Sequence, residues 1–199
     1  MNKIFFETIK AVNGKIYHLE YHQKRYEKTL NDFSIKIKYD LRNFIDPPKD
    51  GVYRCRLVYD ITKSPHTICV TYHEYKKRDI NLLRIINCND IDYGYKYESR
   101  KELNDLFELR DKCDDILIIR DDLVTDTTIA NIAFWDDGKW ITPRKPLLMG
   151  VTRARLLDDG KIFEADIYAE DIKNFTKVAL LNAMIDFDII MQNKKDIFC

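Results

Sequence analysis

Two segments of the chain carry side chains that could act together in amine chemistry. The first is DYGYKYESR, in which Lys96 lies between two tyrosines. A lysine that is partly desolvated by such neighbours has a deprotonated amine often enough to attack an aldehyde. The second is VTDTTIAN, which carries the carboxylate of Asp126. A carboxylate of this kind can keep a proton on the ring nitrogen of a bound heterocycle.

Two later turns and one earlier helix carry groups of a kind that can bind phosphate. In GVTR, Val151 and Thr152 open a predicted short helix, and the amides at a helix N-terminus attract phosphate. LLNAM contains a second turn at Asn182 and Ala183. Arg25, in HQKR, has a guanidinium that binds phosphate oxygens through two parallel donors. Together these groups suit an aldehyde cofactor that carries a phosphate.

Each of these residues also has a purely structural interpretation. Most lysines of the chain must lie on the surface, and Asp126 alone would be read as a turn residue. Arg25 could be a solvated residue of a charged helix, and Thr152 could belong to an ordinary helix start. The functional interpretation depends on the order in which all the segments follow one another.

In that order and wording the segments resemble the fold-type IV pyridoxal-phosphate enzymes, the class IV aminotransferase family. The resemblance runs from Phe5 to about Ile190. It implies that Lys96 holds pyridoxal phosphate as a Schiff base and later shuttles the proton of the substrate, with Lys101 as the fallback lysine. It also implies that Asp126, where the family usually has Glu, pairs with the pyridinium nitrogen.

The resemblance implies the other site residues as well. The expected cofactor-binding residues are Arg25, Lys96, Asp126, Thr127, Val151, Thr152, Asn182 and Ala183. Thr8, in FETIK, is expected to assist the proton transfer. His18 and His22 lack the spacing of a zinc protease, so we expect no metal and interpret His22 as a packing residue.

Two details favour one reaction over another. Asn182-Ala183 and Phe6-Glu7-Thr8 are similar to aminodeoxychorismate lyases, whereas aminotransferases usually have Gly-Thr or Ser-Thr at the first place. We therefore expect a lyase that releases pyruvate from 4-amino-4-deoxychorismate and leaves 4-aminobenzoate, a folate precursor. The alternatives are a class IV aminotransferase for branched-chain or D-amino acids, a pyridoxal-phosphate-binding protein without turnover, and an α+β interaction module without cofactor.

The substrate loop of many relatives is reduced here to residues 60–65, so the residues that bind the substrate carboxylate do not transfer. Arg54 and Arg56 are replacements by position, although both could equally be strand residues that face solvent.

The composition excludes several other classes of protein. The chain has 199 residues, 45% hydrophobic and 12% aromatic, with 33 basic and 33 acidic side chains. This balance gives no reason to expect a nucleic acid or a membrane as partner. No apolar run could cross a bilayer, and Glu7 comes too early for a signal peptide. Five cysteines without metal-site spacing predict free thiols in a reducing cytoplasm.

Hydrophobic periodicity predicts an α+β chain whose second half is richer in strands. A hairpin turn is expected at Asn13-Gly14 and another at residues 136–138. Helices are expected over residues 18–33, 100–113, 151–158 and 169–174, and strands over 52–60, 67–75, 80–88, 115–120, 129–135, 139–142, 161–165 and 177–182.

The resemblance implies two domains. These are a small N-terminal α+β domain, residues 1–78, and a larger β-rich pseudo-barrel domain, residues 79–199, with the cofactor between them. Members of the family usually form homodimers, so we expect a homodimer.

Overall fold

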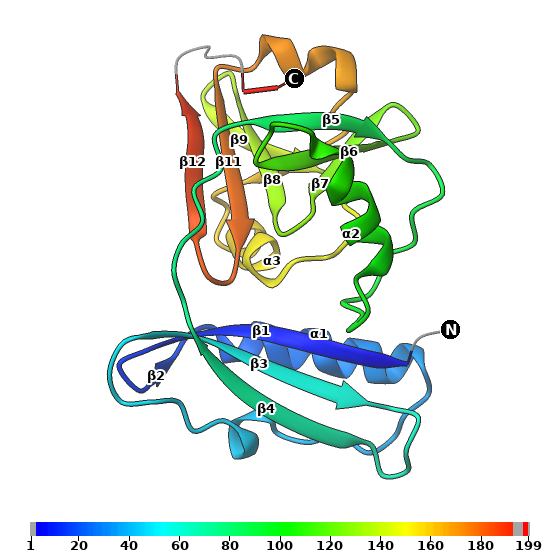
Figure 1. The fold of residues 1–199 in the computed structure, drawn as a ribbon, viewed down its shortest axis with the longest axis vertical. Coiled ribbons are helices and arrows are strands. Elements are labelled where there is room, and N and C mark those ends of the chain that lie inside the picture. Colours follow the sequence, from blue (N-terminus) through cyan, green and yellow to red (C-terminus); the bar gives the residue numbers. More distant parts are fainter. Residues whose placement is uncertain (1–2, 193–196, 199) are drawn as a thin grey trace. The chain divides into compact units, whose positions relative to one another are not determined.

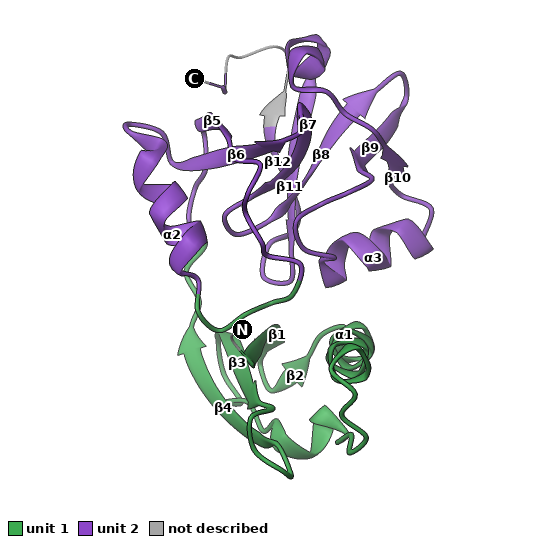
Figure 2. Cartoon of the chain, turned by 90° about the vertical axis from the view of Figure 1, so that its right-hand side faces the viewer, with its two compact units in different colours: residues 1–77, 95–99 green, residues 78–94, 100–199 purple. Residues whose placement is uncertain are grey.

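The computed structural model describes residues 3–192 and 197–198 of the chain, which form a mixed α+β fold. The chain divides into two compact units (Figure 2). Unit 1 comprises Met1–Lys77 and Tyr95–Ser99, and unit 2 comprises Arg78–Gly94 and Arg100–Cys199. The segment around Lys96 therefore packs with the N-terminal unit. The boundary expected from the sequence, between residues 78 and 79, assigns this segment to the second domain instead.

Unit 1 is an antiparallel sheet with one helix packed on a face (Figure 1). Its strands lie in the order β2 (Lys15–Ile16), β1 (Ile4–Val12), β3 (Val52–Asp60) and β4 (Thr67–Glu74). Helix α1 (Leu19–Asp32) and the short 3-10 helix η1 (Leu41–Phe44) follow the first hairpin. The core between helix and sheet contains Phe5, Ile9, Tyr26, Leu30, Leu57 and Tyr59.

Local sequence explains the elements of unit 1. Asn13 and Gly14 both have positive φ, 49° and 77°, as the predicted tight turn between β1 and β2 requires. The predicted helix and the strands β3 and β4 match the observed ranges to within a residue at each end. Helix α1, which carries Arg25, packs on the face of the sheet that carries Phe5 and Ile9.

The segment Tyr95–Ser99 extends this sheet at the start of β1. The backbone N–H of Phe6 donates to the carbonyl oxygen of Lys96 at 3.0 Å, and that of Glu98 donates to Ile4 at 2.8 Å. Phe5 and Tyr97 form an antiparallel bridge between these two bonds. The main chain of Lys96 is thus fixed to β1.

Unit 2 is built on a larger sheet, in the order β10-β9-β8-β7-β6-β5. These strands are β5 (Leu83–Asn87), β6 (Asp115–Arg120), β7 (Leu123–Thr127), β8 (Asn131–Asp136), β9 (Lys139–Pro143) and β10 (Phe163–Ala165). β11 (Lys177–Asn182) pairs with β8 and with β12 (Asp186–Gln192). The helices are α2 (Lys101–Phe107), α3 (Val151–Asp158) and the 3-10 helices η2 (Glu108–Arg110) and η3 (Ala169–Asn174).

The sheet of unit 2 branches at β8. One edge of β8 pairs with β11, and the other edge meets β7 at Asn131 and β9 from Phe134 onward. Three strands thus converge on β8 and pack around a core that contains Leu117, Ile132, Phe134, Val178 and Leu180. The branch point lies at Asn131, inside the VTDTTIAN segment.

The structure corrects several expectations. Strands β7 and β12 were not predicted, and β8 begins at Asn131 rather than at residue 129 because a tight turn occupies residues 127–130. The helix predicted over residues 100–113 ends at Phe107 and continues only as η2.

The cysteines and the helices bear on two further expectations. Cys55, Cys69 and Cys88 are free, but Cys113 is disulfide-bonded, so the expectation of free thiols is wrong there. Spacing along the chain cannot reveal which thiols meet in the fold. Cys199 lies outside the described residues. Among the described residues, no helix combines the length and the apolar character that crossing a membrane requires.

Candidate active site

Lys96 lies on unit 1 beside an aromatic ring. Its Nζ is 4.6 Å from the centroid of the Phe6 ring, and its side chain is partly buried. Phe6 is 6% exposed, so one side of the amine faces an apolar surface. An aromatic ring therefore lies beside Lys96, as expected. It belongs to Phe6, which lies 90 residues earlier in the sequence.

A buried polar cluster lies on the other face of β1, between the strand and α1. Glu7 is 0% exposed and accepts a hydrogen bond from His22 Nδ1 at 2.6 Å. Arg25 donates to the same carboxylate from Nε at 2.8 Å and from Nη2 at 2.5 Å. This two-point pairing fixes the plane of the Arg25 guanidinium.

The charges of this cluster balance. Burial alone would raise the pKa of Glu7, but the charge of Arg25 and the hydrogen bonds from His22 and Arg25 lower it to about 2. Burial lowers the pKa of His22, against the opposing effect of Glu7, and Lys96 is among the positive charges that lower it further. The cluster therefore consists of a carboxylate, a guanidinium and a neutral imidazole that donates from Nδ1.

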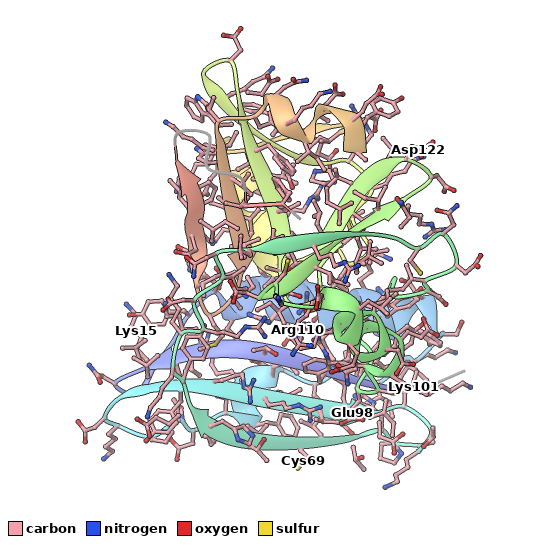
Figure 3. All side chains as sticks on the ribbon, turned by 45° about the horizontal axis from the view of Figure 1, so that its top comes forward. Lys15, Cys69, Glu98, Lys101, Arg110 and Asp122 are labelled. Carbon is pink, nitrogen blue, oxygen red and sulfur yellow. The ribbon has the colours of Figure 1, made fainter. Side chains whose placement is uncertain are left out.

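Thr8 and the fallback lysine, Lys101, lie in different units. Thr8 lies opposite Arg56 in the β1–β3 register, on the same face of β1 as Phe6. Lys101, the fallback, begins α2 in unit 2 (Figure 3). It is 81% exposed and its Nζ pairs with Asp105 at 2.5 Å. Among the described residues, Lys96 is therefore the one of these two lysines whose amine lies over an aromatic ring.

In unit 2, Asp126 joins two segments at the branch point of the sheet. Asn131 Nδ2 donates to Asp126 Oδ1 at 2.7 Å and to the carbonyl oxygen of Leu148 at 2.9 Å. The backbone N–H of Leu148 donates to Asp126 Oδ2 at 2.9 Å. Burial raises the pKa of Asp126 to about 6, against the lowering effect of these hydrogen bonds. The carboxylate is buried and largely ionised at neutral pH.

Gly150 allows this arrangement because its α-carbon lies against Asn131. A Cβ on Gly150 would lie 1.9 Å from Asn131 Oδ1. Any side chain there must displace Asn131 and, with it, the bonds to Asp126 and Leu148.

Gly150→Ala is therefore expected to lower the free energy of unfolding by about 1–3 kcal/mol. Urea denaturation measures this change. Gly94→Ala is the matched control, since its Cβ would have no neighbour closer than 3.9 Å. A Gly150→Ala protein as stable as the Gly94→Ala protein would show that Asn131 does not need its position.

Thr127 shapes the turn between β7 and β8. Its Oγ1 accepts from the backbone N–H of Ala130 at 3.1 Å, and its own N–H donates to the Ala130 carbonyl at 3.0 Å. The same turn is held from outside, where Arg100 Nη2 donates to the carbonyl of Thr128 at 2.6 Å. The hydroxyl of Thr128 donates to buried Asp115 at 2.7 Å. The turn that carries Asp126 is thus braced on several sides.

Helix α3 begins where the sequence predicts a phosphate-binding turn. Gly150 is its N-cap in an extended conformation, and Val151 and Thr152 are buried. Because Gly150 has no side chain to cap the first turn, a phosphate could take that place. Arg153, the last residue of GVTR, is 3% exposed and donates to the carbonyl of Pro143 at 2.8 Å and to Glu164 at 2.7 Å. Its function in this structure is to hold α3.

The side chain of Asn182 is engaged within the protein. Its Oδ1 accepts from the N–H groups of Met184 and Ile185, at 2.9 and 3.1 Å. Its Nδ2 donates to the carbonyl of Ile129 at 3.3 Å, so it links the β11–β12 turn to the β7–β8 turn. A phosphate contact from Asn182 or Ala183, which remains a prediction, would thus come from the backbone.

Each unit contains residues whose chemistry suits a part of pyridoxal phosphate. Unit 2 has a buried carboxylate at Asp126. It also has the eight-residue helix α3, whose N-terminus has no side-chain cap. Unit 1 has a lysine amine against an aromatic ring and an oriented guanidinium at Arg25. A guanidinium has five N–H donors, so pairing with Glu7 does not exclude a phosphate contact.

Sequence reasoning did not assign a function to Glu7 or to Asn131. Glu7 lies within the FET motif, on the strand face of Phe5 and Ile9, and both neighbours are fully buried. A charged residue on an apolar strand face is a signal that could have identified it. Asn131 gave no such signal, because its link from Asp126 to Leu148 depends on where the loop before α3 lies in the fold.

Comparison with known proteins agrees with this description. The family model for class IV aminotransferases matches residues 104–189. An uncharacterized protein of Haemophilus influenzae is 38% identical over 185 residues, which cover 90% of this chain and 96% of that protein. A crystal structure from Haemophilus somnus, provisionally named as a 4-amino-4-deoxychorismate lyase, is 35% identical with a TM-score of 0.81, and covers 92% of this chain and 97% of that one.

A more distant structure shares the fold. The pyridoxal-phosphate-bound form of a hypothetical aminotransferase from Mycobacterium tuberculosis has a TM-score of 0.80 at 15% identity, over 96% of this chain and 81% of that one. The fold is that of the fold-type IV pyridoxal-phosphate enzymes. The chain belongs to the class IV aminotransferase family of enzymes.

Proposed function

We propose that this chain is a pyridoxal-phosphate-dependent 4-amino-4-deoxychorismate lyase, which releases pyruvate and leaves 4-aminobenzoate. The observation that carries the proposal is the 35% identity to the Haemophilus somnus protein of that provisional name over nearly the whole of both chains. The Asn182-Ala183 sequence, which resembles that of aminodeoxychorismate lyases, supports the same choice.

The residues have distinct functions under this proposal. Lys96 supplies the amine that binds the cofactor aldehyde, and Arg25, Val151, Thr152, Asn182 and Ala183 bind its phosphate. Asp126, held by Asn131, pairs with the ring nitrogen through its ionised carboxylate. Thr127 keeps the turn that carries Asp126 in place. Pyridoxal phosphate, when bound, supplies an electron sink for a carbanion at the amine-bearing carbon.

Proton transfer in this scheme belongs to Lys96. The Lys96 amine, when it is not bound to the cofactor aldehyde, would remove and return protons at the amine-bearing carbon of the substrate. The ring of Phe6 holds the Lys96 amine in place, with Nζ 4.6 Å from the ring centroid. Thr8, on the same strand face as Phe6, is proposed to assist.

The test is a product assay with the cofactor-loaded protein and 4-amino-4-deoxychorismate. We expect 4-aminobenzoate and pyruvate in equal amounts. The aminotransferase alternative, which the family model itself supports, predicts glutamate from 2-oxoglutarate with a branched-chain or D-amino acid as donor. Glutamate without 4-aminobenzoate would reject the lyase, and bound cofactor without either product would leave a binding protein.

A further inference from the structure

Arg56 lies on the strand face of unit 1 that carries Phe6. Its Cζ is 4.7 Å from the centroid of the Phe6 ring, and Lys96 Nζ is 4.6 Å from the same centroid. The two cations therefore lie no farther apart than the sum of these distances. Both groups belong to unit 1, so one rigid sheet positions them.

The guanidinium of Arg56 is oriented but not buried. Stacking on Phe6 fixes one side, and Nη2 donates to Glu98 Oε1 at 2.8 Å. Glu98, labelled in Figure 3, is anchored through its backbone to Ile4 of β1. The side chains of Arg56 and Glu98 are 28% and 42% exposed. An exposed pair of this kind contributes little to stability.

The pair leaves a guanidinium that a second carboxylate can approach. Arginine binds carboxylates through a planar fork of donors, and Glu98 occupies one nitrogen of that fork. An amine-bearing substrate that reacts beside Lys96 would place its own carboxylate within reach of Arg56. Arg54 lacks this setting, because it lies opposite Lys10 rather than Thr8 and is exposed.

We propose that Arg56 binds the ring carboxylate of a carboxylated cyclic amine, a group that the substrate and its aromatic product share, and so determines which amines the enzyme accepts. The proposal rests on the proposed function, since it takes its ligand class from that reaction. It also explains why the shortened segment at residues 60–65 need not supply a carboxylate-binding residue. β3 itself supplies one.

The test is calorimetric titration of the cofactor-loaded protein with 4-aminobenzoate and with aniline, which lacks the carboxylate. Arg56→Gln is expected to weaken 4-aminobenzoate binding at least ~10-fold, while leaving aniline unchanged. Arg56→Lys keeps the charge without the fork and should lie between. Arg54→Gln, the matched control on the same strand face, should bind like the wild type.

Three results would overturn the proposal. They are unchanged binding in Arg56→Gln, an equal loss in Arg54→Gln, and a wild type that prefers aniline or binds both equally. The product assay is independent of these titrations. Turnover without dependence on Arg56 would reject this inference alone, and Arg56-dependent binding without turnover would reject only the lyase.

Discussion

Lys96→Ala is expected to reduce release of 4-aminobenzoate by more than ~10⁴-fold, because one side chain supplies both the covalent attachment and the acid–base group. The position of Lys96 makes this specific. Its carbonyl is bonded to the Phe6 backbone and its amine lies 4.6 Å from the Phe6 ring. Initial rates at saturating cofactor measure the effect.

Two variants control for the loss of a positive charge. Lys96→Arg keeps the charge and a cation over Phe6 but has no amine that can form the covalent link, so it should be as inactive as Lys96→Ala. Lys101→Ala removes an exposed lysine paired with Asp105 and should retain activity to within about twofold. Substantial activity in Lys96→Arg would show that charge, rather than the amine, is what the reaction requires.

Glu7→Gln is expected to destabilise the protein by about 3–5 kcal/mol at neutral pH, because it leaves the charge of Arg25 without its buried partner. Glu7 is fully buried and accepts bonds from both His22 and Arg25. The same change should weaken pyridoxal phosphate binding, since the Arg25 guanidinium loses the carboxylate that orients it. Urea denaturation and cofactor titration measure the two effects.

The pH dependence gives this prediction a sign. Glu7 has a pKa of about 2 in the folded protein against an ordinary value of 4.5, so its contribution to stability is complete above pH 4.5. It is lost as the pH falls toward 2, and the wild type and Glu7→Gln should then converge. Glu98→Gln, which breaks an exposed Arg–Glu pair, should cost at most about 1 kcal/mol. A constant gap between wild type and Glu7→Gln down to pH 2 would contradict the ion-pair account.

Much of the fold follows from local sequence. The Asn13-Gly14 hairpin, α1 and strands β3, β6 and β11 lie where turn residues and hydrophobic periodicity predict them. β12 was missed because it is an edge strand, which within the described residues pairs only with β11. β7 was missed because LVTDT is short and polar, and its Thr127 is a turn residue as well as a strand residue.

The site was predictable in its residue types but not in its connections. The VTDTTIAN and GVTR motifs identify Asp126 and α3, but only the fold shows that Asn131 joins Asp126 to the loop before α3 and that Gly150 packs against Asn131. The contact of Lys96 with Phe6 likewise depends on the return of residues 95–99 to the first sheet. Such long-range pairings are set by tertiary packing, which no local pattern encodes.

The function proposed for Lys96 is tested by identifying the lysine that pyridoxal phosphate modifies. The protein is incubated with the cofactor, reduced with borohydride, digested and analysed by mass spectrometry. We expect one modified peptide, labelled at Lys96, and no label in Lys96→Ala. Label at Lys101 or another lysine, or no label at all in the wild type, would contradict this expectation.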